Sequence, residues 1–272
     1  MKKKIIIFAL LCCMLLSGCQ NTNDTQNGDS NMNQNQNAAN DENNNKNTTP
    51  AQENGDTVDN TGNRFEESSN GNDSQEYTVE DVKITDPNEA LNRLKEGNQR
   101  FMNDDSAMIN VTSQRRDDLL EGQTPYAVVL SCSDSRVTPN IIFNVGLGEI
   151  FDVRLAGNVL NEEALGSIEY GVEHLHAPLI VVMGHESCGA VTAAYDYAQN
   201  GTEAEGNINS LVENIHPAIK DSEDLDGAIH ANIDYVTEEL LKDEIVKHLV
   251  DEGKVKVVKA YYALNGEVTF QE

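Results

Sequence analysis

Apolar residues in the C-terminal part of this chain follow two alternating patterns. Short, unbroken apolar runs are typical of strands buried on both faces, and they occupy residues 126–130 and 179–183. Mostly apolar segments over residues 150–155 and 255–264 predict two further strands. Between these runs, helical spacing or alanine-rich composition predicts helices, over residues 165–175, from about 187 to 197 and from about 233 to 250. An earlier helix is expected to begin at Asp86 and Pro87, because aspartate caps helices and proline suits their first position. The alternation predicts an α/β domain with a mostly parallel central β-sheet flanked by helices.

The N-terminus has a different pattern. Three lysines at residues 2–4 precede an apolar run over residues 5–16, and a Ser-Gly-Cys sequence ends at Cys19. This is the arrangement of a secretory signal, and the apolar run is shorter than the roughly 20 residues of a spanning helix. The Leu-Ser-Gly-Cys segment resembles the bacterial lipoprotein cleavage box. That resemblance implies a signal peptide over residues 1–18, acylation of Cys19, and anchoring at the outer face of the cytoplasmic membrane or cell envelope. An ordinary signal cleaved near the same place is the alternative.

The region that follows Cys19 is dominated by asparagine, with little apolar content until about residue 80. Such a composition buries too little apolar surface to offset the chain entropy lost on folding. We therefore expect a disordered tether over residues 19–83 and one globular domain over residues 84–272, a length that allows a sizeable core. Asparagine-rich tracts can also aggregate or adhere, but the interspersed acidic residues favour a solvated spacer.

The formal net charge of −27 limits the partners of the chain. Nucleic-acid binding requires clustered lysine and arginine, so the sequence predicts no nucleic-acid partner. A polybasic membrane contact is disfavoured for the same reason, which leaves the lipid on Cys19 as the expected link to a membrane.

Candidate chemistry gathers just past the ends of two predicted strands. Cys132 follows the first strand, and His185 and Cys188 follow the third. In parallel α/β sheets, ligands bind outside the carboxyl ends of strands. Two thiolates and an imidazole are ligands that zinc prefers, and a catalytic zinc site commonly has three protein ligands and one open position. Two cysteines in an exported protein could instead form a disulfide, but a histidine three residues from Cys188 favours zinc.

Asp134 and Arg136 lie two and four residues beyond Cys132. Alone, they would be interpreted as a surface ion pair of little energetic value. Beside a zinc ion, the carboxylate can accept a hydrogen bond from metal-bound water, while the guanidinium keeps that carboxylate ionised and oriented. The sequence therefore predicts a catalytic dyad next to the metal.

The combined motifs resemble those of the β-class carbonic anhydrases. The resemblance rests on Cys-x-Asp-x-Arg from Cys132, on His-x-x-Cys from His185, on the 53-residue separation of these two residues, and on the intervening Gly-Leu-Gly-Glu and Arg-Leu-Ala-Gly-Asn segments. It covers nearly the whole predicted domain. It implies one zinc per chain on Cys132, His185 and Cys188, and reversible hydration of carbon dioxide to bicarbonate and a proton by zinc-bound hydroxide.

The resemblance also implies further properties. Gln123, nine residues before Cys132, falls where the family has a glutamine that hydrogen-bonds substrate; the alternative is an ordinary loop residue after Gly122. A homodimer or a higher even-numbered oligomer is implied as well. Some members bind bicarbonate at a regulatory pocket, to which Arg154 corresponds. The tryptophan expected three residues before the first zinc cysteine is replaced by Val129, so we expect an open site without this regulation.

Two alternatives remain from the sequence. Relatives of this fold hydrolyse carbonyl sulfide or carbon disulfide with the same zinc ligands, so the substrate could be a sulfur analogue. The domain could also be a non-catalytic, zinc-binding surface lipoprotein. The presence of Asp134 and Arg136 argues against the second alternative, because a structural zinc site needs neither residue.

Overall fold

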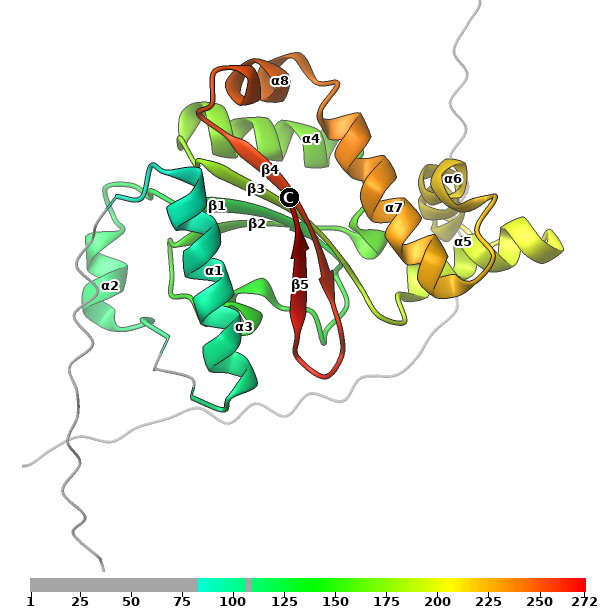
Figure 1. The fold of residues 1–272 in the computed structure, drawn as a ribbon, viewed down its shortest axis with the longest axis horizontal. Coiled ribbons are helices and arrows are strands. Elements are labelled where there is room, and N and C mark those ends of the chain that lie inside the picture. Colours follow the sequence, from blue (N-terminus) through cyan, green and yellow to red (C-terminus); the bar gives the residue numbers. More distant parts are fainter. Residues whose placement is uncertain (1–82, 106–108) are drawn as a thin grey trace, which may run out of the picture. The chain divides into compact units, whose positions relative to one another are not determined.

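The computed structural model describes residues 83–105 and 109–272, and these residues form a five-stranded sheet with helices on both faces (Figure 1). The predicted signal peptide, Cys19 and the predicted tether lie outside the described residues, apart from residue 83. The strand order is β2-β1-β3-β4-β5. The strands are β1 (Ala127–Ser131), β2 (Ile150–Arg154), β3 (Leu179–His185), β4 (Lys256–Tyr262) and β5 (Val268–Gln271).

The first four strands run parallel, and only β5 is antiparallel to its neighbour β4. Both central strands, β1 and β3, are buried along their whole length, as their unbroken apolar sequences predict. The prediction of an α/β fold with a mostly parallel sheet is therefore confirmed.

Helices cover the two faces of the sheet unequally. They are α1 (Pro87–Met102), α2 (Ser113–Asp118), α3 (Pro139–Ile142), α4 (Glu162–Glu169), α5 (Gly189–Asn200), α6 (Ile208–Ile219), α7 (Leu225–Leu240) and α8 (Glu244–Asp251), with a 3₁₀ turn η1 (Ala156–Asn158) and a π-helical turn η2 (Tyr170–His174). One core cluster joins α1 and α3 to alternate residues of β1 and β3, such as Val129 and Val181. The other core cluster contains residues of the five helices from α4 through α8, packed against the intervening residues of β1 and β3, such as Val128 and Val182. Both β1 and β3 therefore contribute side chains to two hydrophobic cores, one on each face of the sheet.

The helix predicted from about residue 233 to 250 is wrong as a single element. The chain forms α7 and α8 there, with a break at residues 241–243. Asp243 explains the break, because its side chain accepts a hydrogen bond from the Val246 amide at 2.9 Å and so caps the start of α8. The predicted helix over residues 165–175 likewise becomes α4 followed by the π-helical turn η2.

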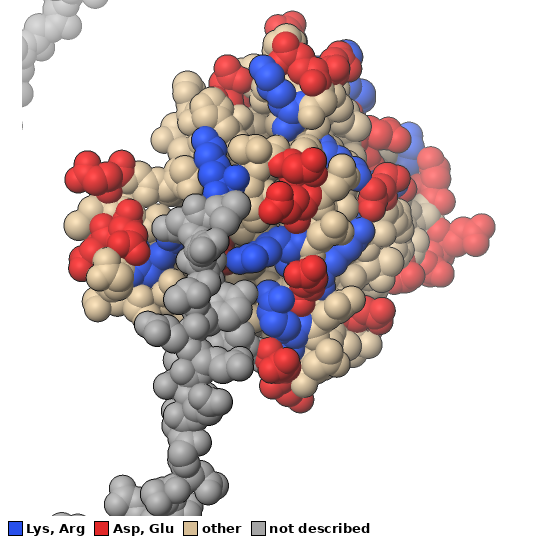
Figure 2. Space-filling view, turned by 60° about the vertical axis from the view of Figure 1, so that its left-hand side comes forward, with Lys and Arg blue, Asp and Glu red and all other residues tan. Residues whose placement is uncertain are grey.

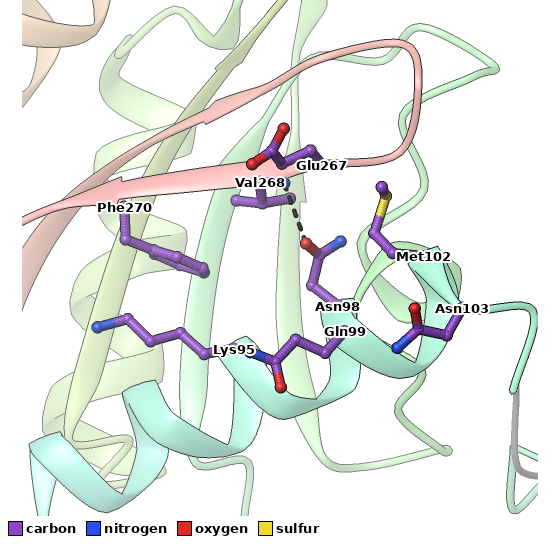
Figure 3. Close-up of a pocket in the computed structure, with 8 residues that line it drawn as sticks. All are labelled: Lys95, Asn98, Gln99, Met102, Asn103, Glu267, Val268 and Phe270. Carbon is purple, nitrogen blue, oxygen red and sulfur yellow. Dashed lines mark hydrogen bonds between the residues drawn. The ribbon is translucent and has the colours of Figure 1, made fainter.

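The last predicted strand also ends early. β4 stops at Tyr262, and the chain turns at Gly266, whose φ of +106° suits glycine, into β5. The buried Asn98 of α1 secures this hairpin, because its side-chain oxygen accepts a hydrogen bond from the Val268 amide at 3.0 Å (Figure 3). Its side-chain nitrogen donates to the Gly266 and Ile142 carbonyls at 2.8 and 3.2 Å. A groove of about 470 Å³ runs alongside this contact, between α1 and β5.

Two surface properties complete the description. Basic and acidic side chains are interspersed on the face shown in Figure 2. Within residues 83–105 and 109–272, the longest helices are too short or too polar to cross a bilayer.

Candidate metal centre

The sheet brings the three predicted ligands together at one edge. Cys132 directly follows the last residue of β1, and His185 is the last residue of the neighbouring parallel strand β3. Parallel neighbours end at the same edge of a sheet, so the two side chains meet there. Cys188 follows after a tight turn in which Ser187 has a φ of +56°, and it occupies the N-cap position of α5.

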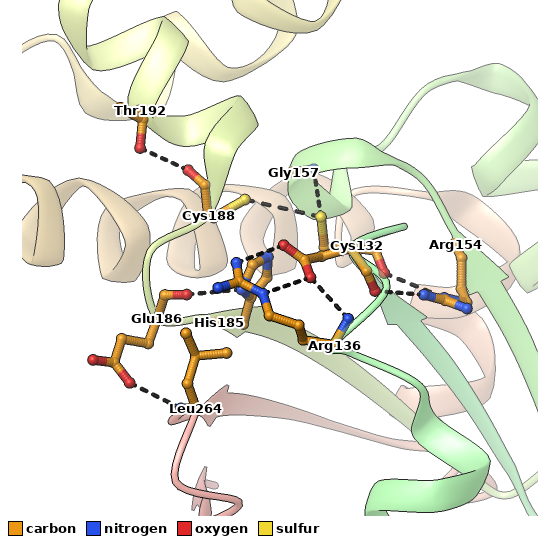
Figure 4. A network of polar contacts seen from close by, with 10 residues as sticks. Cys132, Arg136, Arg154, Gly157, His185, Glu186, Cys188, Thr192 and Leu264 are labelled. Atoms are coloured by element: carbon orange, nitrogen blue, oxygen red, sulfur yellow. Dashed lines mark hydrogen bonds and ion pairs between the residues drawn. The ribbon is translucent and has the colours of Figure 1, made fainter.

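The distances among these side chains suit a metal ion. The ligand atoms of Cys132, His185 and Cys188 all lie within 4.8 Å of one another, and all three residues are buried. The two sulfur atoms are 3.9 Å apart (Figure 4). Two sulfurs bound at about 2.3 Å to one tetrahedral zinc would be about 3.8 Å apart, whereas a disulfide requires about 2.05 Å. Both cysteines are free thiols in the structure.

His185 presents one nitrogen to this cluster. Its Nδ1 lies 2.9 Å from the Glu186 carbonyl oxygen, which can only accept, so Nδ1 carries the proton. The Nε2 atom is buried and has no hydrogen-bond partner among the described residues. A buried nitrogen lone pair without a partner is costly, and a metal ion would satisfy it. The donor set and this unpartnered atom therefore fit a zinc ion.

The two thiols share their proton unequally. Cys132 accepts a hydrogen bond from the Cys188 thiol and another from the Gly157 amide at 3.3 Å, and these contacts lower the pKa of Cys132. The shared proton and burial raise the pKa of Cys188. Of the two sulfur atoms, Cys132 is therefore the one whose surroundings favour the charged form.

Asp134 and Arg136 form the predicted pair. Arg136 donates from Nε to Oδ1 at 2.9 Å and from Nη2 to Oδ2 at 2.8 Å, and its backbone amide donates to Oδ1 at 2.9 Å. These bonds hold the pKa of Asp134 well below its usual range. The carboxylate side chain is 19% exposed, against 51% for Arg136, so the anion faces inward and the guanidinium borders solvent.

Arg154 has a role that the sequence did not indicate. It pairs in register with Ser131 across β1 and β2, and its guanidinium donates to the Cys132 and Asp134 carbonyls at 3.2 and 2.9 Å (Figure 4). It thereby braces the loop that carries both site residues. Only the pairing of β1 with β2 could have revealed this contact in advance.

Gln123 lies apart from the cluster within one chain. It is exposed and precedes β1, whereas Cys132 follows β1. The five-residue strand between them spans roughly 16 Å at about 3.3 Å per residue. Gln123 and the cluster are therefore at opposite ends of β1.

The fold and site define a class: an α/β protein with a buried Cys-His-Cys group at the carboxyl ends of parallel strands. Comparison with known proteins gives the family. Residues 127–268 match the family model described as carbonic anhydrase. Because this match covers more than half of the chain, the protein belongs to the carbonic anhydrase family.

Individual relatives support this family assignment. The chain is 46% identical to carbonic anhydrase 2 of Mycobacterium tuberculosis over 135 residues, which are 50% of this chain and 65% of the relative. It is 44% identical to a carbonic anhydrase of Mycolicibacterium smegmatis over 135 residues, covering 50% and 66%. The matched region thus spans slightly less than two thirds of either relative.

Solved structures share the fold. A β-carbonic anhydrase of Aspergillus fumigatus superimposes with a TM-score of 0.51 at 25% identity, covering 59% of this chain and 83% of that one. The β-carbonic anhydrase of Coccomyxa gives 0.52 at 24% identity, covering 66% and 85%. The fold is that of the β-class enzymes.

Proposed function

We propose that this protein catalyses the reversible hydration of carbon dioxide to bicarbonate and a proton, with one zinc ion per chain held by Cys132, His185 and Cys188. The observation that carries the proposal is the buried cluster of two thiols and an unpartnered imidazole nitrogen, together with the nearby Asp134–Arg136 pair. Membership of the carbonic anhydrase family supports the same activity.

When bound, zinc supplies Lewis-acid chemistry and lowers the pKa of a water molecule from 15.7 to about 7. The residues of this chain would do the rest. Cys132 and Cys188 would provide negative charge, and the Glu186 carbonyl, by holding the proton on Nδ1, aims the lone pair of His185 at the cluster. Two thiolates donate more charge than imidazoles would, so we expect the activity to favour alkaline pH.

Asp134 would orient the attacking water. A carboxylate oxygen has two lone-pair sites, and Oδ1 already accepts two hydrogen bonds from Arg136 whereas Oδ2 accepts one. Oδ2 is therefore the atom with room to accept an O–H of water and to direct the oxygen lone pair at carbon dioxide. Arg136 would keep the carboxylate ionised and fix its orientation through these hydrogen bonds.

This arrangement leads us to propose an open site without bicarbonate regulation. Arg154, which corresponds to a residue of the regulatory pocket, has its guanidinium engaged by two backbone carbonyls. A pH–rate curve should then follow ordinary titration. A steep sigmoidal loss of activity at lower pH would contradict this proposal.

Within one chain, Gln123 and the metal cluster lie at opposite ends of β1. Gln123 would therefore contact substrate at the cluster of a second copy of the chain. We therefore propose a homodimer or a higher even-numbered oligomer. A β-carbonic anhydrase of Sordaria macrospora with the same fold (TM-score 0.52, 20% identity, 57% of this chain and 84% of that one) is described as tetrameric, which supports assembly.

Subunit complementation tests this arrangement. Gln123→Ala and Asp134→Asn subunits, each of strongly reduced activity alone, should regain activity when mixed, since a hybrid dimer has one site free of both changes. Absence of recovery in hybrids verified by native mass spectrometry would place Gln123 outside the substrate site.

We also propose that the chain is exported and anchored through a lipid on Cys19. The basic residues 2–4, the apolar run and the Leu-Ser-Gly-Cys segment support this proposal. Mass spectrometry of the N-terminal peptide from bacterial membranes should find acylated Cys19, and Cys19→Ser should release the protein. Unmodified Cys19 or cleavage at another residue would contradict lipidation.

The experiment that tests the substrate compares turnover of carbon dioxide, carbonyl sulfide and carbon disulfide by the same zinc-loaded sample. Carbon dioxide should be the fastest substrate. A clear preference for either sulfur compound would replace the proposed activity with hydrolysis. Zinc binding without turnover of any of the three would point to a binding protein.

A further inference from the structure

Asn232 is a polar residue in an apolar setting. It lies on α7 and is 1% exposed, among the buried Ala228, Ile229 and Ile233. These neighbours pack tightly on β3: a Cβ added at Gly184, next to His185, would lie 2.7 Å from Ile233. Buried asparagine in such a place requires a hydrogen-bonding reason.

The hydrogen bonding of Asn232 indicates that it holds the turn η1. Its Nδ2 donates to the Gly157 carbonyl at 2.9 Å, whereas its Oδ1 is buried and has no partner among the described residues. Asn98, the comparable buried asparagine under the hairpin, has both amide atoms engaged. Asn232 is thus poorly suited to general stabilisation, and its one contact fixes the turn η1.

The turn η1 needs such an anchor. Gly157 has φ +70° and ψ +20°, and Asn158 follows with φ +43°, so two successive residues adopt the left-handed region. That conformation is costly for a residue with a side chain and persists when the surroundings hold it. The Gly157 amide donates a hydrogen bond to Sγ of Cys132 at 3.3 Å, and the Gly157 carbonyl accepts one from Asn232.

We propose that Asn232 is a positioning residue for the metal centre, acting through Gly157 on the Cys132 thiolate. The N–H···S bond withdraws charge from the sulfur and fixes its direction, so the position of the turn sets how strongly Cys132 donates to a metal. A single helix residue thereby connects α7 to a ligand that directly follows β1, 100 residues earlier in the chain. The inference rests on the proposed metal site.

The test measures metal binding and not only activity. Asn232→Ala deletes the side-chain amide, and Asn232→Leu replaces it with an apolar group of similar size. Thr237→Val is the matched control, because it deletes another buried hydrogen bond of α7, from Oγ1 to the Ile233 carbonyl at 2.8 Å, without contact to the turn. Each full-length protein is loaded with Zn²⁺ and challenged with excess chelator, and a Co²⁺-loaded sample reports the sulfur-to-cobalt charge-transfer band.

Both Asn232 variants should release zinc roughly 10- to 100-fold faster than the wild type, the usual effect of losing a residue that orients a ligand, and should shift the charge-transfer band. Thr237→Val should match the wild type in both readouts. Variants at position 232 that keep the wild-type release rate and spectrum would overturn the inference while leaving the metal site intact. A wild-type protein that binds neither metal would overturn both.

Discussion

Replacing Gly157 by alanine tests how tightly the turn behind the metal centre is built. The φ of +70° is left-handed, which costs a residue with a Cβ about 1–2 kcal/mol. The new Cβ would also lie 2.6 Å from Cδ1 of Ile215 and 3.1 Å from Cβ of Ala190. Ile215 is fully buried, so its methyl group cannot move aside freely, and overpacking of this kind costs about 1–3 kcal/mol.

The sum predicts a loss of about 2–5 kcal/mol in the free energy of unfolding, a large part of the roughly 5–15 kcal/mol that a domain has. For a domain of this size, the melting temperature should fall by roughly 10 °C. The assay is urea unfolding followed by circular dichroism, with zinc bound and after chelation. Because the same substitution displaces the amide that contacts Cys132, zinc should also dissociate faster.

Two other glycines separate the contributions. Gly201 has φ +66° with open space around its Cβ direction, so Gly201→Ala should lose only the conformational part, about 1–2 kcal/mol. Gly166 lies within α4 with open space and ordinary helical backbone, so Gly166→Ala should be neutral or stabilising by about 0.5–1 kcal/mol. If Gly157→Ala were no less stable than Gly201→Ala, the packing argument would be refuted.

Three further predictions concern the site. Asp134→Asn should lower hydration activity roughly 10²- to 10⁴-fold with zinc content unchanged, measured by stopped flow and metal analysis; loss of zinc instead would make Asp134 a structural residue. Arg136→Leu should raise the pKa of Asp134 toward its ordinary value. Since a lowered folded-state pKa stabilises fully above the unfolded value near 3.9 and progressively less as the pH falls below it, urea unfolding should show a stability deficit that is constant above about pH 5 and shrinks below pH 4; a deficit independent of pH would contradict the pairing. Chelation should lower the melting temperature and make Cys132 and Cys188 reactive toward a thiol reagent, whereas equal reactivity before and after would argue against their ligation.

The strands and ligand positions could be predicted because each depends on local sequence. The apolar runs of β1 and β3 need no distant partner to be recognised, and the rule that ligands bind at carboxyl ends of strands then places Cys132 and His185 at one edge. The pairing of Asp134 with Arg136 follows from their separation of two residues.

Other features depend on contacts far apart in the chain. The Asn-Gly pair at residues 265 and 266 is a local signal for the hairpin that adds β5, but the contact that holds this hairpin comes from Asn98, about 170 residues away. The break before α8 is a local exception, because it depends on the cap that Asp243 forms with Val246, three residues later. The contact of Asn232 with Gly157 spans 75 residues, so only the packed structure reveals it.

The most direct test of the account is stopped-flow hydration of carbon dioxide at alkaline pH by the chain without residues 1–18, with zinc content measured on the same sample. Hydration far above the uncatalysed rate, with about one zinc per chain, is the predicted result. A sample that holds a full complement of zinc and leaves the hydration rate unchanged would contradict the proposed function.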